Sequence, residues 1–269
     1  MRVLFIGDVV GKPGREGLAA AMPALREEHL PDLVIVNGEN AGGGVGITPD
    51  AAKDIFDAGA DAITLGNHTY RHREVYSYLG SEQRIIRPAN FPEGNPGRGH
   101  VIVDAAGMKV AVVNLSGALH LQVERSPFTA ADEILDQLKG TADAVIVDFH
   151  AELTSEKVAM CWHLDGRAAA VIGTHTHVPT ADARVLPGGT AALTDVGMTG
   201  SRSGIIGVKR EQALEAFRTQ MPIRFETATE DIWVMGAAID IGDDGLARSI
   251  TQVLYEVTPP GSPGPDARP

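Results

Sequence analysis

The sequence predicts an α/β fold in which two mixed β-sheets pack face to face and are flanked by helices. Through the first half of the chain, short aliphatic runs alternate with helical patterns, which is the βαβ rhythm of a parallel sheet with right-handed crossovers. Five of these runs stop at a glycine or a polar residue. After Gly188 the rhythm changes and the chain ends in a hairpin pattern, which indicates a second sheet.

Polar side chains follow five predicted strands at the point where each strand ends. The runs and the polar residues after them are Val3–Ile6 with Asp8, Leu33–Val36 with Glu39 and Asn40, Ala62–Leu65 with Asn67 and His68, Ala144–Val147 with His150, and Ala168–Ile172 with His175 and His177. One such residue is most often a turn or helix cap. Because open α/β sheets bind ligands outside the carboxyl ends of their strands, five together predict one crevice.

Two helices between these strands have clear end signals. One follows Gly46, with Thr48 as N-cap, Pro49 at the first helical position and Gly59 past its end. The other is expected over residues 154–164, with Thr154 as N-cap and a close near Gly166.

The remaining segments add further strands, a loop and a helix to this doubled sheet. We expect a long surface loop over 87–99, antiparallel strands over 100–103 and 109–114 around an Ala106-Gly107 turn, a strand over 190–194, a helix over 209–219, and a terminal hairpin of 232–241 with 247–256 around Asp243-Asp244-Gly245. Residues 1–257 are interpreted as one domain. Residues 258–269 are rich in proline and glycine and are expected to form a disordered tail.

Composition narrows the class of protein. The 269 residues are 43% hydrophobic and 22% charged, which is typical of a soluble globular protein. No apolar run is long enough for a membrane span, no signal-peptide layout is present, and the single Cys161 suits a reducing compartment, so we expect a cytoplasmic protein. The net charge of −12 disfavours long duplex nucleic acid as a partner, whereas a small phosphorylated substrate is compatible. A homo-oligomer is neither required nor excluded.

The pair His175 and His177 predicts a metal site more directly than any other pattern. In an extended segment, side chains two residues apart point to the same side, so these imidazoles can converge on one ion. Alone the pair is weak evidence, because core histidines with hydrogen-bond partners are frequent.

The other strand ends supply too many ligands for one ion. The candidates are Asp8, Glu39, Asn67, His150, His175 and His177, with Asn40 as a seventh. Carboxylates, imidazoles and amides without a thiolate suit hard to borderline divalent metals. Two ions that share a carboxylate account for this number of ligands better than one ion. Enzymes that catalyse in-line attack on phosphorus commonly use such a two-metal centre. We favour iron or manganese and leave zinc and magnesium open.

These motifs, in order, resemble those of the calcineurin-like metallophosphoesterases, and in particular the bacterial YmdB branch. The matching residues are Asp8, Asn37-Gly38-Glu39-Asn40, Gly66-Asn67-His68, His150 and Gly173-Thr174-His175-Thr176-His177. The chain departs from the broad superfamily at Val10, where a histidine is usual, at Glu39, where an aspartate is usual, and at Thr69, where a glutamate is usual. These departures agree with the YmdB branch.

The resemblance implies a fold and a set of roles. It implies the superfamily's double-sheet sandwich, with Asp8, Glu39, Asn40 and His177 on one metal and Glu39, Asn67, His150 and His175 on the other. It also implies hydrolysis of 2′,3′-cyclic nucleotides by a hydroxide that bridges the metals, with His68 as general acid. The alternative for His68 is a residue that only orients Asn67.

Two questions stay open at this point. The loop Gly197–Gly207 could offer Ser201, Arg202 and Ser203 to a phosphate or ribose, or it could be a plain connector. The ligand set is also compatible with a phosphomonoesterase, or with a metal- or nucleotide-binding regulatory protein whose hydrolysis is incidental.

Overall fold

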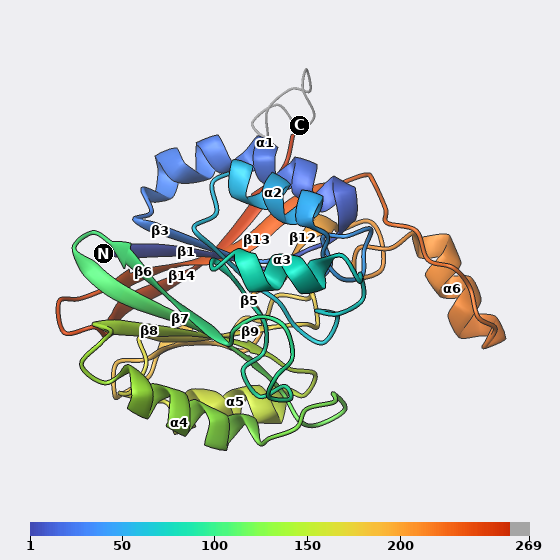
Figure 1. Cartoon of the computed structure of the whole chain (residues 1–269). Coiled ribbons are helices and arrows are strands. Elements are labelled where there is room, and N and C mark those ends of the chain that lie inside the picture. Colours follow the sequence, from blue (N-terminus) through green and yellow to red (C-terminus); the bar gives the residue numbers. More distant parts are fainter. Residues whose placement is uncertain (259–269) are drawn as a thin grey trace.

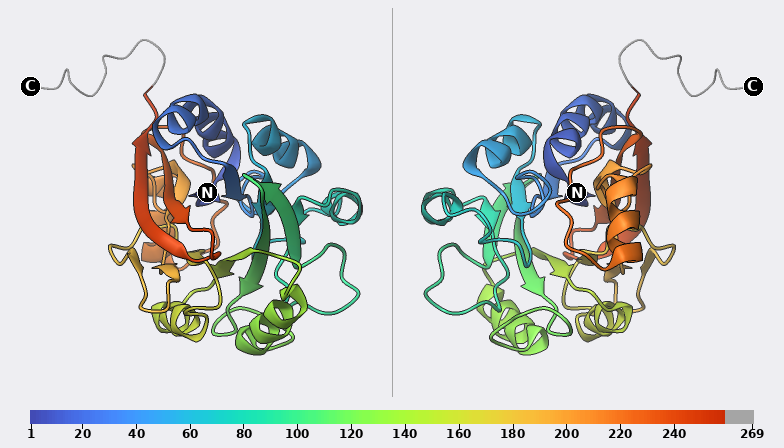
Figure 2. Two further views of the ribbon diagram at one scale, coloured as in Figure 1. Left: turned by 90° about the vertical axis from the view of Figure 1, so that its left-hand side faces the viewer. Right: turned by 90° about the vertical axis from the view of Figure 1, so that its right-hand side faces the viewer.

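Two β-sheets lie face to face in the computed structural model, with helices on the outer face of each (Figure 1). Two further views show the same layers from the sides (Figure 2). The structure describes residues 1–258. Residues 259–269, which hold nearly all of the tail expected to be disordered, lie outside the described residues. Within residues 1–258, no helix has the length and apolarity needed to cross a membrane.

The larger sheet has eight strands, in the order β2-β12-β13-β1-β3-β4-β5, with β14 also paired to β13. Its strands are β1 (Arg2–Ile6), β2 (Asp8–Val9), β3 (Leu33–Asn37), β4 (Ala62–Thr64), β5 (Ile85–Ile86), β12 (Met198–Ser201), β13 (Ile232–Ile241) and β14 (Ala247–Glu256). The strands β1, β3, β4 and β5 are parallel, whereas β13 runs antiparallel to its neighbours β1, β12 and β14. The sheet is therefore mixed, as predicted.

The second sheet has six strands in the order β10-β11-β9-β8-β7-β6. They are β6 (His100–Ala105), β7 (Met108–Ser116), β8 (Ala144–His150), β9 (Ala170–Thr174), β10 (Arg184–Val185) and β11 (Ala191–Leu193). The helices are α1 (Gly11–His29), α2 (Pro49–Asp57), α3 (Val75–Ser81), α4 (Pro127–Leu138), α5 (Thr154–His163) and α6 (Arg210–Thr219).

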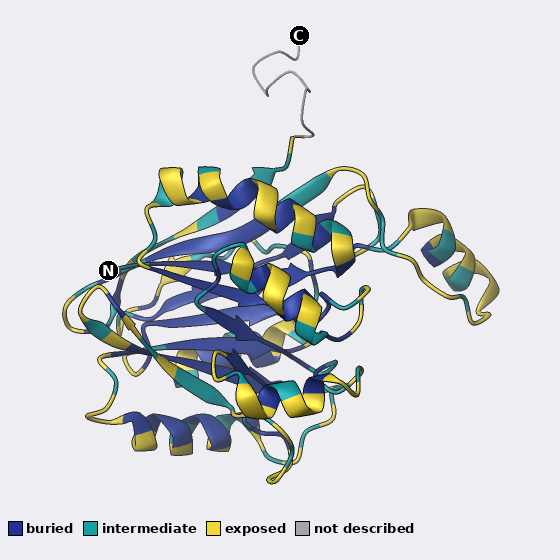
Figure 3. Ribbon diagram, turned by 45° about the horizontal axis from the view of Figure 1, so that its top comes forward, coloured by how far each residue is buried: buried dark blue, intermediate teal, exposed yellow. Residues whose placement is uncertain are grey.

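Alternation along the strands explains the layers, because successive side chains of a strand point to opposite faces. In β1, Val3 and Phe5 belong to the core between the two sheets, whereas Leu4 and Ile6 belong to the core beneath α1 and α2. In β8, Ile146 faces the other sheet, and Phe149 packs into the core that includes α4 and α5. Both faces of each central strand are buried, which agrees with the dark sheets and yellow outer helix faces of Figure 3.

Local signals placed several elements correctly. Thr48 caps α2, with its Oγ1 accepting a hydrogen bond of 3.1 Å from the backbone N of Ala51. The turn at Ala106 and Gly107 joins β6 to β7, and both residues have positive φ. The terminal hairpin has the predicted bounds of both strands.

The predicted cap of α5 was wrong. Thr154 is the first helical residue, Leu153 occupies the N-cap position, and no side-chain hydrogen bond caps this end. Instead, the carbonyl oxygen of Leu153 accepts the first helical hydrogen bonds, from the backbone N of Glu156 and of Lys157, each at 3.1 Å. The helix ends at His163, and Gly166 follows with a φ of +76°, which agrees with the predicted end near Gly166.

The topology brings the polar strand ends to one edge of the sandwich. Strands β1, β3 and β4 of the first sheet run parallel to one another, and so do β8 and β9 of the second. The carboxyl ends of each parallel set meet at one edge of its sheet. Side chains that follow strands of the two facing sheets can therefore meet at this edge of the sandwich.

Candidate metal centre

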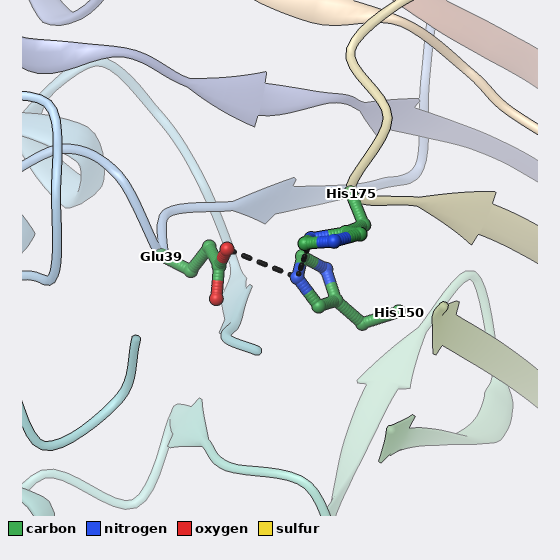
Figure 4. A group of neighbouring side chains, drawn as sticks. All are labelled: Glu39, His150 and His175. Atoms are coloured by element: carbon green, nitrogen blue, oxygen red, sulfur yellow. Dashed lines mark hydrogen bonds and ion pairs between the residues drawn. The ribbon is translucent and has the colours of Figure 1, made fainter. Parts of the chain in front are cut away.

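Three donors from both sheets form the tightest cluster of the site (Figure 4). Glu39 follows β3 of the larger sheet, His150 ends β8, and His175 follows β9 of the smaller sheet. The Nε2 of His150 lies 2.9 Å from Oε1 of Glu39 and 3.0 Å from Nδ1 of His175. The Oδ1 of Asn67 lies 3.0 Å from the same Nε2. Carboxylate, amide and imidazole atoms at this spacing could hold a divalent ion.

A second set of donors gathers around Asp8. Its Oδ1 lies 3.7 Å from Nε2 of His177, and its Oδ2 accepts a hydrogen bond of 3.2 Å from the backbone N of His175. The Nδ2 of Asn40 lies 3.2 Å from Nε2 of His177 and 3.4 Å from Oε1 of Glu39. Glu39 thus stands between the two sets, where a shared carboxylate was expected.

One oxygen of Asp8 has no hydrogen-bond partner among the described residues, although the side chain is fully buried. A buried polar atom without a partner is costly, and a buried carboxylate is costlier still unless a cation compensates it. A divalent ion beside Oδ1 would remove that cost. The donor chemistry and this unpaired oxygen together fit a metal centre.

The charged groups of the cluster shift one another's pKa values. Burial would raise the pKa of Glu39, but the imidazoles of His150 and His68 hold that pKa well below its usual value. Burial would lower the pKa of His150, but the Glu39 carboxylate raises it to about 9. Burial and the adjacent His150 lower the pKa of His175 to about 3. His175 therefore offers a free lone pair at neutral pH, whereas a metal ion must displace the proton of His150.

Hydrogen bonds behind the imidazoles fix which ring nitrogen faces the cluster. The Nδ1 of His150 lies 2.8 Å from Oγ1 of Thr174, which donates a hydrogen bond of 2.7 Å to Oδ1 of Asp148. The Nδ2 of Asn37 donates to the other oxygen of Asp148 at 2.9 Å. These hydrogen bonds keep a ring proton of His150 on Nδ1, so Nε2 is the nitrogen that must lose its proton to bind a metal.

The other two imidazoles are oriented in the same way. The Nδ1 of His177 lies 3.0 Å from the carbonyl oxygen of Ile206, and the Nε2 of His175 lies 2.9 Å from Oε2 of Glu152. In His175 it is therefore Nδ1 that faces His150, and in His177 it is Nε2 that faces Asp8. Each imidazole offers one free nitrogen to the centre.

The backbone of the His175–His177 segment differs from the extended conformation assumed from the sequence. Strand β9 ends at Thr174, and His175 and His177 have φ values of +93° and +66°. Left-handed conformations at non-glycine residues are strained, and they persist where the surroundings impose them. The two histidines still converge on Asp8, but they reach it through a turn.

A buried ion pair holds this turn in place. The Oδ2 of Asp195 accepts hydrogen bonds from the backbone N of Thr176 at 3.1 Å, from its Oγ1 at 2.5 Å, and from Nζ of Lys157 at 2.8 Å. Both charged side chains are almost completely buried. The pair therefore fastens the residue between the two histidines to α5 and to the segment before β12.

The imidazole of His68 lies beside both sets of donors. Its Nδ1 is 2.8 Å from Oδ1 of Asn40 and 3.3 Å from Oε1 of Glu39, and its backbone N donates to Oε2 of Glu39 at 3.0 Å. A quarter of the His68 side chain is exposed, and it lines a cavity beside the centre, so a substrate in that cavity can reach it. These contacts tie His68 to Asn40, so a purely orienting role would act on Asn40.

The residues suggested for substrate contact, Ser201, Arg202 and Ser203, have partners outside the centre. The hydroxyls of Ser201 and Ser203 donate to the carbonyl oxygen of Glu230 at 2.6 and 3.3 Å. The guanidinium of Arg202 stacks over the ring of Trp233, at 4.6 Å from its centroid. Arg202 also lines a cavity of about 330 Å³ that His177 borders.

Sequence reasoning missed several supporting residues. Asp148 carried a signal, because it lies two positions before His150 in β8 and so shares its face. Lys157 also carried one, since it lies on the same side of α5 as the buried Met160 and Cys161. Cys161 is also buried, and burial raises the pKa of its thiol to about 12.

Known proteins resemble this chain over nearly its whole described length. A family model described as YmdB-like protein matches residues 4–253. A Bacillus subtilis protein named 2′,3′-cyclic-nucleotide 2′-phosphodiesterase is 48% identical over 243 residues, which cover 90% of this chain and 92% of that protein.

Two solved structures share the fold. A hypothetical protein from Thermus thermophilus has a TM-score of 0.89 at 42% identity, covering 95% of this chain and 99% of its own. A Mycoplasma pneumoniae structure described as a novel phosphatase has a TM-score of 0.89 at 32% identity, covering 95% and 93%. The expected sandwich of two mixed sheets is confirmed, and the chain belongs to the YmdB-like family of metallophosphoesterases.

Proposed function

We propose that this protein is a two-metal phosphodiesterase that hydrolyses small phosphodiesters, with 2′,3′-cyclic nucleotides as its substrates. The observation that carries the proposal is that seven side chains with metal-ligating groups, from both sheets, meet in one connected cluster, and that one of them, the buried Asp8, has an oxygen without a hydrogen-bond partner among the described residues. The printed name of the Bacillus subtilis relative supports the same class of substrate.

The donors divide between two sites in this proposal. Asp8, Asn40 and His177 would hold one ion, Asn67, His150 and His175 would hold the other, and Glu39 would contact both. When bound, two divalent ions neutralise the phosphoryl oxygens and lower the pKa of the water that attacks phosphorus. Iron and manganese suit this donor set at least as well as zinc, because the cluster contains no thiolate.

The protein's own residues would do the rest of the chemistry. Asn40 accepts from Nδ1 of His68 and so leaves Nε2 as the ring nitrogen that can meet the leaving oxygen. A protonated His68 would donate a proton from Nε2 as the ribose oxygen departs. Burial of Asp8 and Glu39 keeps bulk water away from their charges, which strengthens their electrostatic interactions.

The proposal is tested by metal content and substrate preference measured on the same preparation. We expect two metal ions per chain after reconstitution with manganese or iron, turnover of adenosine 2′,3′-cyclic phosphate, and faster hydrolysis of bis-p-nitrophenyl phosphate than of p-nitrophenyl phosphate. The reverse preference would indicate a phosphomonoesterase. Tight nucleotide binding without turnover would indicate a regulatory binding protein. Either result would overturn the proposal.

Replacement of His68 by alanine should separate acid catalysis from metal binding. We expect His68→Ala to keep both metals and to lose about 10²- to 10⁴-fold in kcat on adenosine 2′,3′-cyclic phosphate, the usual range for general acid–base catalysis. The loss on bis-p-nitrophenyl phosphate should be much smaller, since p-nitrophenolate leaves without needing a proton. His29→Ala, on α1 and remote from the centre, serves as the control. Equal losses on both esters, or loss of metal, would show that His68 maintains the centre instead.

A further inference from the structure

The metal centre opens into a small cavity with two chemically different walls. The cavity has a volume of about 220 Å³, smaller than the ~300–1,000 Å³ typical of sites for drug-sized ligands. One wall is polar and belongs to the centre: Glu39, Asn40, His68, His175 and His177. The other is mainly apolar and comes largely from the segment around α6: Val10, Gly44, Ile205, Ile206, Val208, Ala213, Phe217 and Phe225.

Helix α6 stands off from the body of the fold (Figure 1). The two chain segments that lead to and from it are held together: the backbone N of Lys209 donates to the carbonyl oxygen of Glu226 at 2.9 Å, and the N of Ala228 donates to that of Gly207 at 3.0 Å. We call residues 205–228 the arm. Its base is tied to the centre, because the carbonyl oxygen of Ile206 lies 3.0 Å from Nδ1 of His177.

The two phenylalanines of the arm are unusually exposed for such large apolar side chains. Phe217 is 76% exposed and Phe225 is 50% exposed, although both line the cavity. Neither ring takes part in an aromatic contact within residues 1–258. Exposed apolar surface beside a polar site is typical of a ligand-binding surface, and a flat ring face is what a nucleobase stacks on.

We propose that Phe217 and Phe225 form a stacking platform for the base of a nucleotide whose phosphate occupies the metal centre. This inference rests on the proposed function, because it assumes that the centre binds the phosphate. In a nucleoside 2′,3′-cyclic phosphate, one ribose joins the phosphate to the base, so both must be held within one sugar's length. One small cavity supplies both a polar wall for the phosphate and an apolar wall with two aromatic rings for the base.

The platform also predicts which nucleotides are preferred. The side chains of the cavity's apolar wall are aliphatic and aromatic, so they offer no hydrogen-bonding groups that could distinguish one base from another by its edge. Stacking on such a wall tolerates every base and grows with ring area. The KM values for adenosine and guanosine 2′,3′-cyclic phosphates should therefore be similar, and both should be lower than those for the cytidine and uridine compounds.

The test compares a nucleotide with a base-free diester that has the same cyclic phosphate. For the double variant Phe217→Ala/Phe225→Ala, we measure kcat/KM on adenosine 2′,3′-cyclic phosphate and on glycerol 1,2-cyclic phosphate. The ratio of the first to the second should fall about 10-fold or more, through KM, as expected for the loss of base stacking. Leu214→Ala is the matched control, because Leu214 is 48% exposed on the same helix but does not line the cavity.

Direct binding separates failure of the platform from failure of the proposed function. Calorimetric titration of the metal-loaded protein should show weaker binding of adenosine 3′-monophosphate to the double variant, with the affinity for inorganic phosphate retained. If the wild type hydrolyses neither diester, the proposed function fails, and the titration still decides on the platform. An unchanged kcat/KM ratio with unchanged titrations would overturn the stacking platform. So would a change of molar mass in light scattering with an unchanged ratio, which would assign the rings to an interface between copies of the chain.

Discussion

Glu39→Gln should abolish the two-metal centre while leaving the fold intact. Glutamine has nearly the shape of glutamate, but it lacks the charge that Glu39 places 2.9 Å from Nε2 of His150. Glu39 also stands between the donors around Asp8 and those around His150, where both ions would need its oxygens. We expect the metal content to fall below two per chain, and turnover of adenosine 2′,3′-cyclic phosphate to fall by more than the ~10- to 100-fold that the loss of a supporting partner costs.

Two control substitutions of the same type show whether the effect is specific to Glu39. Glu152→Gln changes the same side-chain type at the residue that contacts Nε2 of His175, outside the expected ligands, and it should cost about 10- to 100-fold. Glu133→Gln, which affects only a surface ion pair with Arg125 on the outside of the molecule, should leave metal content and turnover unchanged. Two metals per chain and full turnover in Glu39→Gln would remove Glu39 from the centre.

The larger part of the fold could be predicted because its determinants are local. Val3 to Ile6 form a continuous apolar run, which is the pattern expected of a short strand that is buried on both faces. The terminal hairpin was placed with its observed bounds because Asp243-Asp244-Gly245 separates two long runs of strand-forming residues. The cap of α5 was misplaced because threonine at an N-terminus can be either cap or first helical residue, and here the extended N-cap position falls one residue earlier, at Leu153.

The residues that gather at the centre could also be predicted, but their geometry could not. Polar residues after strands reveal the kind of ligand, because parallel strands deliver their carboxyl ends to one edge. The turn with the left-handed backbone of His175 and His177 contacts the buried pair of Lys157 and Asp195, two residues that are 38 positions apart in the sequence. No local pattern encodes such a contact. For the same reason, nothing in the sequence distinguishes Phe217 and Phe225 from ordinary core residues, and only the structure places them on an exposed arm.

Gly66→Ala should damage the centre as severely as the loss of a ligand. A Cβ at this position would lie 2.2 Å from Oε2 of Glu39 and 2.3 Å from Nε2 of His150. Both side chains are completely buried, so they can make room only by moving away from their present partners, and Thr69 holds the backbone by donating to the carbonyl oxygen of Gly66 through its N and its Oγ1. The methyl group would therefore occupy the space where the donors meet. We expect metal content to fall and turnover to drop more than ~100-fold, with a stability loss of about 1–3 kcal/mol from overpacking.

The backbone itself does not forbid alanine at this position, because Gly66 is not among the glycines with positive φ. The effect should therefore arise from the added methyl group alone. Gly80→Ala makes the same change in α3, where a Cβ would meet nothing within 4 Å, and it should raise the free energy of unfolding by about 0.4–1 kcal/mol without altering metal content. Metal content, turnover and thermal unfolding measured on both variants decide the matter. A Gly66→Ala protein that binds metal and turns over substrate like the wild type would mean that the donors do not meet beside Gly66 in the working enzyme.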